Sequence, residues 1–159
     1  MDQKLSKRSQ KVQNALNELD ISLEVIELPD STRTAVEAAQ AIGCQIGQII
    51  KSLIFRGGKT DHAILVLASG QNHVNEKKIE MLIAEPLEKA NANFVRKHTG
   101  FAIGGVPPVG HSEKLATYID EDLLEYSVLW AAAGTPHAVF KLKSEDLVKI
   151  TAGIVVDIQ

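Results

Sequence analysis

Lys51 is the charged residue most out of place in the sequence, because it interrupts the apolar segment IGQIIKSLIF. Side chains alternate along a strand, so Lys51 should share a face with Ile49 and Leu53 and lie opposite Ile50 and Ser52. A lysine there either extends its stem to the rim of the sheet or points into a polar cavity. In a cavity, an anionic group must offset its lost hydration. Periodicity leaves both alternatives open, and the second makes Lys51 a candidate substrate-binding residue.

The segment GGVPPVGH, Gly104–His111, contains three glycines and two adjacent prolines in eight residues. Glycine brings its bare backbone N–H close to a ligand, so Gly104 and Gly105 are candidate donors to a polar substrate atom. Pro107 and Pro108 donate nothing, and their contribution would be a rigid shape. A rigid connector between a helix and a strand explains the same composition, and composition alone does not decide between the two.

The segment GTPHAVF contains the third candidate, His137, at the start of a predicted strand. Gly134 and Pro136 precede it. A lone histidine at a strand edge is more often a structural hydrogen-bonding group than a catalyst, so the sequence leaves its role open.

The usual motifs of catalytic and cofactor sites do not occur in this sequence. It has no G-x-S-x-G, no phosphate-binding loop, no H-E-x-x-H and no dinucleotide fingerprint. The five histidines are far apart and lack the spacing of metal ligands, so we expect no metal and no cofactor. The single Cys44 excludes an internal disulfide framework. It follows Gly43 at a predicted helix end, where the helix dipole should raise the thiol pKa and make it a poor nucleophile.

The composition is that of one soluble domain. The 159 residues are 45% hydrophobic and 23% charged, and no linker divides them, so we predict a single domain over 1–159. No apolar run is long enough to cross a bilayer and no signal peptide precedes the domain, which predicts a cytoplasmic protein. A net charge of −3 argues against a broad basic face for nucleic acid but permits docking of one end through a local patch.

Periodicity and capping signals predict an α/β (α+β) fold, with a central mixed, largely antiparallel sheet surrounded by helices. Thr34 followed by Glu37 is a capping box, Gly43 ends the same helix, and Ser144 is a predicted N-cap. Gly57 and Gly58 predict a hairpin turn between two apolar strands. The other predicted helices are those around 5–19, 75–84 and 90–100. The other predicted strands are 23–28, 117–120, 128–134, 136–142 and 154–158.

Four motifs occur in a recognisable order: TAVEAAQAIG, GQIIKSLIF, the G-x-x-x-P element Gly104–Pro108, and AGTPHAVFKL followed by SEDLVKIT. With this order and spacing the chain resembles the YbaK/EbsC family, the free-standing relatives of the editing domain inserted in bacterial prolyl-tRNA synthetases. The resemblance covers the chain from about Ile21 to its end. It implies a compact α/β domain with a barrel-like mixed sheet.

The resemblance also implies an activity and its site. The activity is that of a trans-acting aminoacyl-tRNA deacylase, which hydrolyses the ester between a wrong amino acid and the terminal adenosine of tRNA. The implied partners are the 3′ end of mischarged tRNA and a prolyl-tRNA synthetase or elongation factor on which the protein docks. The implied catalytic residues are Lys51 and Gly104. The implied substrate-binding residues are Gly105, Val106, Pro107, Pro108, Gly134 and His137.

This chemistry is consistent with the residues present. An aminoacyl ester is already activated, so its hydrolysis requires a positioned water and stabilisation of an oxyanion more than a strong nucleophile. The amides of Gly104 and Gly105 are the candidate oxyanion donors. A small pocket would select its amino acid by excluding larger ones, since binding distinguishes one methylene by only about 1–3 kcal/mol. The candidate walls are Ile50, Leu53, Ile103, Val106 and Ala133.

The sequence does not identify the amino acid. Alanine, cysteine, serine, threonine and 2-aminobutyrate on tRNA-Pro or a related tRNA are all open. Two other functions also stay open: a non-catalytic tRNA- or synthetase-binding module of the same fold, and a regulatory protein that binds a small amino-acid ester or nucleotide. Phosphate contacts make tRNA binding depend steeply on salt, which would separate the last function from the others.

Overall fold

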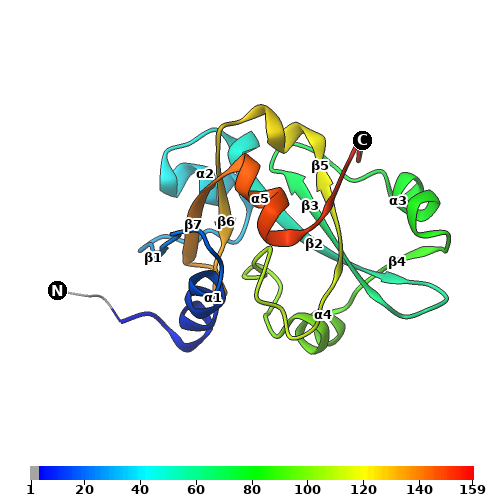
Figure 1. Ribbon diagram of the computed structural model, residues 1–159, viewed down its shortest axis with the longest axis horizontal. Coiled ribbons are helices and arrows are strands. Elements are labelled where there is room, and N and C mark those ends of the chain that lie inside the picture. Colours follow the sequence, from blue (N-terminus) through cyan, green and yellow to red (C-terminus); the bar gives the residue numbers. More distant parts are fainter. Residues whose placement is uncertain (1–3) are drawn as a thin grey trace.

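The computed structural model describes residues 4–159 and contains one eight-stranded sheet with helices packed around it (Figure 1). The strands are β1 (Val25–Glu27), β2 (Ile49–Gly57), β3 (Ala63–Ser69), β4 (Leu87–Lys89), β5 (Ala116–Asp120), β6 (Val128–Ala132), β7 (Ala138–Lys143) and β8 (Ile154–Val156). The helices are α1 (Lys7–Asn17), α2 (Ala35–Ile42), α3 (Glu76–Ile83), α4 (Ala92–Thr99) and α5 (Ser144–Thr151). Two short 3-10 helices, η1 (Ile46–Gln48) and η2 (Glu121–Glu125), complete the elements.

The sheet is mixed, as the sequence predicts. Its order is β1-β7-β6-β2-β3-β5-β8, with β4 paired to β2 outside this path. The pairs β1–β7, β6–β7, β2–β3 and β2–β4 are antiparallel, whereas β2–β6, β3–β5 and β5–β8 are parallel. The parallel β2–β6 pairing is short and joins only Ile49 to Trp130 and Ile50 to Ala131. Beyond Ile50, therefore, β2 continues without a hydrogen-bonded neighbour in β6.

The predicted helix ends agree with the structure at two helices. In α2 the Thr34 hydroxyl accepts the Glu37 N–H at 3.1 Å, and Gly43 ends the helix in the left-handed conformation with φ +82°. In α4 the Asn91 side chain accepts the Phe94 N–H at 2.8 Å, and Gly100 ends the helix. Figure 1 shows α3 and β4 at the end of the molecule opposite α1.

Two details differ from the prediction. Ser144 is the first residue of α5 and Lys143 holds the N-cap position, because β7 continues to Lys143 and the chain enters the helix directly. Strand β4 was not predicted. Its three residues have no strand pattern of their own, and they are extended because they pair with β2 through Phe55 opposite Lys89.

The main core lies between the sheet and α1, α4 and α5. Val12 and Leu16 of α1 are fully buried, as are Phe101 and Phe140, and Leu5 and Leu19 pack against the same cluster. The first helix therefore lies within the predicted range 5–19 and buries one apolar face. No helix within residues 4–159 is long and apolar enough to cross a membrane.

Candidate functional site

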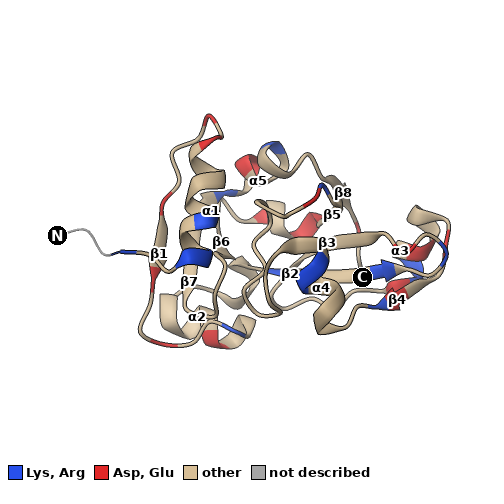
Figure 2. Cartoon of the chain, turned by 90° about the horizontal axis from the view of Figure 1, so that it is seen from below, with Lys and Arg blue, Asp and Glu red and all other residues tan. Residues whose placement is uncertain are grey.

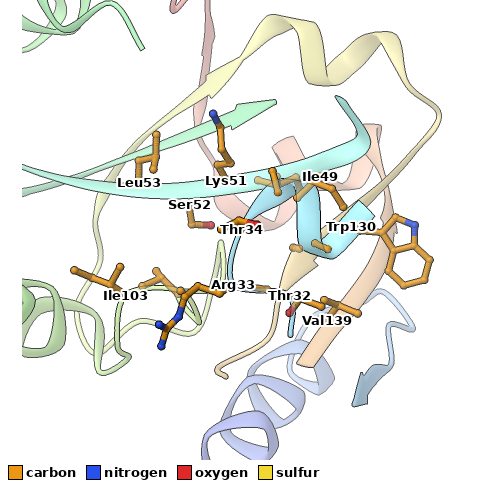
Figure 3. Close-up of a pocket in the computed structure, with 17 residues that line it drawn as sticks. Thr32, Arg33, Thr34, Ile49, Lys51, Ser52, Leu53, Ile103, Trp130 and Val139 are labelled. Atoms are coloured by element: carbon orange, nitrogen blue, oxygen red, sulfur yellow. The ribbon is translucent and has the colours of Figure 1, made fainter. Parts of the chain in front are cut away.

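A cavity of about 350 Å³ opens where β2 and β6 separate, next to the N-terminal end of α2 (Figure 3). Its lining comes from four parts of the chain: the turn before α2 with the start of that helix, strand β2, the 103–106 segment, and β6 with β7. The lining residues are Thr32, Arg33, Thr34, Ala35, Ala38, Ile49, Ile50, Lys51, Ser52, Leu53, Ile103, Gly104, Val106, Trp130, Ala131, Ala132 and Val139. The walls are therefore mostly small or branched apolar side chains.

The glycine loop is held by backbone contacts. Gly104 has φ +94°, a conformation that favours glycine, and a Cβ placed on it would lie 3.2 Å from Cγ of Arg33. The Gly105 N–H donates to the Ala102 carbonyl at 3.0 Å, while the Gly105 carbonyl accepts the Gly134 N–H at 2.8 Å. A Cβ on Gly105 would lie 2.8 Å from the carbonyl carbon of Gly134, so no side chain fits between the two segments.

Because Gly105 uses its N–H inside this turn, the prediction that it donates to an oxyanion is wrong. The Gly104 N–H lies outside that hydrogen bond, and Gly104 lines the cavity. Gly104 is therefore the glycine of this pair that remains a candidate donor.

The prolines of the loop are buried, and a histidine four residues on holds one of their carbonyls. Nε2 of His111 donates to the Pro107 carbonyl at 2.7 Å, which requires the hydrogen on Nε2. Burial lowers the pKa of His111, the hydrogen bond to Pro107 opposes this change, and the charge of Lys11 adds to it. The loop that follows Gly104 is thus anchored by a histidine whose neutral form is favoured.

Lys51 lines the cavity, but its ammonium group is directed elsewhere. Figure 3 shows it on the side of β2 opposite the Ser52 hydroxyl, as the alternation predicts. There it donates to the Asn72 carbonyl. Burial lowers the pKa of Lys51, and the negative charge of Asp120 partly offsets that effect.

A buried polar cluster surrounds this position. Asp120 is 1% exposed and accepts hydrogen bonds from Ser69 N at 2.9 Å, Asn72 Nδ2 at 2.9 Å and Asp122 N at 3.0 Å. Asn72 Nδ2 also donates to Asp122 at 2.8 Å. The cluster holds the Asp120 carboxylate near enough to Lys51 to raise its pKa. It also fixes Asn72, whose carbonyl accepts the hydrogen bond from Lys51.

The structure brings together only part of the predicted site. Lys51, Gly104 and Val106 line one cavity, as do the predicted wall residues Ile50, Leu53 and Ile103. The prediction that Ala133 forms a wall is wrong, because Ala131 and Ala132 line the cavity and Ala133 does not.

Five other predicted residues do not line this cavity: Gly105, Pro107, Pro108, Gly134 and His137. Gly105 and Gly134 pack backbone against backbone behind it, Pro107 is buried, and Pro108 borders a separate surface hollow near Ile150. His137 is exposed in the turn between β6 and β7, where its N–H donates to the Thr135 hydroxyl at 3.2 Å. For these five, a role in shaping the pocket is indirect.

Sequence reasoning missed four polar residues of the site: Thr32, Arg33, Thr34 and Ser52. Arg33 is exposed and contacts Gly104, and the Thr32 hydroxyl donates to the Pro136 carbonyl at 2.9 Å. The capping signal of Thr34 located the start of α2 correctly, but nothing local indicates that this helix start faces β2. For Ser52 the alternation gave the face opposite Lys51, which is the face that the cavity uses.

Cys44 packs against the cluster formed by Ala38, Ala39 and Ile49. Burial raises the pKa of its thiol, while a hydrogen bond at its backbone opposes this effect. The predicted direction is confirmed, and its main cause is burial, where the prediction had assigned the helix dipole.

Known proteins resemble this chain over most of its length. The uncharacterized protein YwhH of Bacillus subtilis (strain 168) is 32% identical over 124 residues, which are 78% of this chain and 78% of that protein. EbsC of Enterococcus faecalis (strain ATCC 700802 / V583), named as a candidate Cys-tRNA(Pro)/Cys-tRNA(Cys) deacylase, is 28% identical over 128 residues, with 76% of this chain and 73% of that protein covered.

A crystal structure described as a candidate trans-editing enzyme for prolyl tRNA synthetase superposes with a TM-score of 0.92. It is 49% identical in sequence, and the superposition covers 98% of this chain and 99% of that one. The family described as the aminoacyl-tRNA editing domain matches residues 29–150, which include every residue that lines the cavity. These matches confirm the resemblance to the YbaK/EbsC proteins, and the chain belongs to the aminoacyl-tRNA editing domain family.

Proposed function

We propose that this protein is a trans-acting hydrolase that removes a small amino acid from mischarged tRNA, with tRNA-Pro as the first candidate. The observation that carries the proposal is the cavity itself. It combines a glycine amide at Gly104, the lysine of the family motif and mostly apolar walls, all within the editing domain. The relatives named for Cys-tRNA deacylation and for trans-editing support the same class of reaction.

The amino-acid side chain enters the apolar part of this cavity. Ala38, Ala131 and Ala132 leave room for a short side chain, and the branched Ile50 and Val139 close the space around it. A larger cognate amino acid is excluded by these walls. Exclusion gives more discrimination than binding, which separates neighbouring sizes by only about 1–3 kcal/mol per methylene.

The reaction is direct hydrolysis of the ester. The oxygen of a bound water attacks the carbonyl carbon, the bond from that carbon to the ribose oxygen breaks, and the water's proton passes to the ribose oxygen. The substrate's neighbouring ribose hydroxyl orients the water, so no serine or histidine nucleophile is required. The Gly104 N–H stabilises the carbonyl oxygen as it becomes negative, a contribution that is largest in a site shielded from water.

Lys51 holds an oxygen of the substrate in this proposal. Its ammonium donates to the Asn72 carbonyl on the far side of β2, so it exchanges this partner for the substrate when the ester binds. Because Lys51 is partly buried, a charge-assisted bond to the substrate is stronger there than at the surface. The bond holds the ester in register with Gly104.

The test is single-turnover deacylation of a panel of mischarged tRNAs. The panel carries Ala, Cys, Ser, Thr or 2-aminobutyrate on tRNA-Pro, and Ser on tRNA-Ala. We expect rapid loss of at least one small amino acid and none of Pro. Lys51→Ala removes the bond to the substrate oxygen, and Gly104→Ala strains the backbone at φ +94° and so displaces the donor N–H. Each should lower the rate by about 100-fold, the effect of losing one well-placed donor.

Lys77→Ala is the matched control, because Lys77 is exposed on α3 and does not line the cavity. It should keep the wild-type rate. Wild-type rates in Lys51→Ala would contradict the role given to this lysine. If the folded protein hydrolyses no member of the panel but still binds tRNA, it is the non-catalytic binding module and the proposal is wrong.

A further inference from the structure

Ser52 contributes to the cavity a hydroxyl group that has no hydrogen-bond partner. Within residues 4–159 its oxygen is buried and unbonded, and Figure 3 shows it on the face of β2 opposite the Lys51 ammonium. A buried hydroxyl without a partner is costly and rare in folded proteins, so it indicates a ligand that supplies the missing bond. Ser9 has the other buried hydroxyl without a partner among these residues, but it lies on α1 and does not line the cavity.

The two other hydroxyl groups of the lining already have partners in the protein. Thr32 donates to the Pro136 carbonyl at 2.9 Å, and Thr34 accepts the Glu37 N–H at 3.1 Å. Ser52 differs because the short β2–β6 pairing ends before it, so β6 does not run beside it and supplies no partner. In the part of the chain that the structure describes, Ser52 therefore has the lining hydroxyl that is free to bond a ligand.

The cavity contains no charged partner for an ionised side chain. No Asp or Glu of residues 4–159 lines it, and of its two cations the Lys51 ammonium is on the opposite face of β2 and Arg33 is exposed. The acidic residue of α2, coloured red in Figure 2, is Glu37, which is exposed and accepts a hydrogen bond from the Ser31 hydroxyl at 2.9 Å. We therefore expect the missing partner of Ser52 to be a neutral polar group.

We propose that Ser52 determines specificity: its hydroxyl bonds the side-chain hydroxyl of the amino acid that is removed, so the preferred substrates are esters of serine and threonine. This inference rests on the proposed function, which puts the amino-acid side chain in this cavity. Ile50 and Ser52 are two positions apart on one face of β2, about 7 Å along the strand, so one amino acid can contact both. A hydroxyl both donates and accepts, which lets two hydroxyls pair in either direction. The methyl group of threonine packs against the apolar walls at Ala131 and Ala132.

Size alone cannot give this preference. Walls that exclude a larger side chain still admit a smaller one, so a cavity that takes serine also takes alanine. With alanine bound, the Ser52 hydroxyl stays without a partner, whereas serine supplies the bond. Leaving one buried hydroxyl unpaired is sufficient for a preference of at least about tenfold.

The test compares pairs of amino acids that differ by one oxygen atom, serine with alanine and threonine with 2-aminobutyrate, each on tRNA-Pro. In wild-type protein, kcat/KM for the hydroxyl-bearing member of each pair should be at least about tenfold higher. In Ser52→Ala both preferences should fall to about threefold or less, because Cβ keeps the shape of the wall and only the oxygen is lost. Comparing each ratio between the two proteins cancels the intrinsic difference in reactivity between the esters.

Ser127→Ala is the matched control, because Ser127 is exposed just before β6 and does not line the cavity. It should keep the wild-type preference in both pairs. A wild-type protein without a preference for serine and threonine, or a preference that is unchanged in Ser52→Ala, would overturn the proposal.

The stability of Ser52→Ala gives a test that needs no substrate. This variant should raise Tm by about 2 °C or more, since it removes a buried hydroxyl that has no partner in the free protein. A Tm at or below that of wild type would show that the hydroxyl is already bonded, which contradicts the proposal.

Binding of an amide analogue separates this proposal from the proposed function. By calorimetry, wild-type protein should bind 3′-(seryl)amino-3′-deoxyadenosine, whose amide resists hydrolysis, at least about tenfold more tightly than the alanyl analogue. Ser52→Ala should bind the two alike. Tighter binding of the seryl analogue without hydrolysis of any ester removes the proposed function alone, whereas hydrolysis at equal rates within each pair removes the role of Ser52 alone.

Discussion

Two opposing influences act on the charge of Lys51. Burial disfavours its charge, and the carboxylate of Asp120 favours it. Asp122 belongs to the same hydrogen-bonded cluster through Asn72, but Asp120 is the carboxylate whose charge raises the pKa of Lys51. The two aspartates therefore form a natural pair of test and control.

The variant Asp120→Asn should move the alkaline limb of kcat/KM for deacylation to lower pH. The sign follows because the Asp120 charge raises the pKa of Lys51, so its removal lowers that pKa and Lys51 loses its proton earlier as pH rises. A pH profile from about 6 to 10 measures the shift, since an ordinary lysine titrates near 10.4. Asp122→Asn should keep the wild-type profile. Equal shifts in both variants would mean that the cluster acts through structure and not through charge.

For single residues, the sequence predicted the strand face on which a side chain lies, but it did not predict which residue that side chain contacts. Alternation gave the face of Lys51 from Ile49 and Leu53, because the period of a strand is local. It could not give the Asn72 carbonyl as the partner of Lys51, 21 positions along the chain, because this contact depends on where the end of β3 lies. Arg33 was missed for the same reason, since only the fold brings the turn before α2 to the cavity beside Gly104.

At the scale of elements, the 104–111 loop contains three glycines, yet the residues packed around it hold it in one conformation. Residues 105–108 are all buried, and His111 closes the loop on itself through the Pro107 carbonyl. Burial of this histidine lowers its pKa below the usual 6.5, so its charged form is favoured in the unfolded chain relative to the folded one. Protonation of His111 at acidic pH should therefore lower the stability of the folded protein.

The free energy of unfolding should fall as pH decreases from about 6.5 toward the lower folded-state pKa of His111, because the unfolded state binds more protons in that window. His111→Gln keeps a donor for the Pro107 carbonyl but does not titrate, so its loss of stability between about pH 7.5 and pH 5.5 should be smaller. Urea unfolding at the two pH values measures this difference. His73→Gln, at an exposed position, should behave like wild type. The same pH dependence in His111→Gln would assign the effect to another group.

Prediction of whole elements depended on whether their signals are local. Thr34, Gly43 and Gly100 marked helix ends correctly because caps and left-handed glycines act within a few residues. Strand β4 has no such signal and exists through its pairing with β2. The parallel β2–β6 pairing, whose short length opens the cavity, also joins segments about 80 residues apart and has no local signature.

For the whole molecule, a net charge of −3 limits how tRNA can bind. Because Lys51 is assigned to the ester, the cations near the cavity that remain for phosphates are Arg33 and, on the neighbouring strand β4, Lys89. They suffice for only the last few phosphates of a 3′ end. The dependence of tRNA affinity on salt should therefore be shallow, with a log–log slope of about −1 to −2 for two or three contacts to a single strand. Filter binding of uncharged tRNA-Pro between about 50 and 200 mM salt measures it. A slope near −5 would instead indicate a broad basic surface.

The close contact between the Gly105 and Gly134 segments has a consequence for how this protein could change its substrate. Each of the two glycines faces backbone: a Cβ on Gly105 would lie 2.8 Å from Gly134, and one on Gly134 would lie 2.7 Å from the Arg8 carbonyl oxygen in α1. Neither glycine can therefore be replaced by a larger residue unless the backbone moves. New specificity should arise instead at residues that line the cavity, such as Ile50, Ala131 or Val139, where one substitution resizes the cavity without moving the loop.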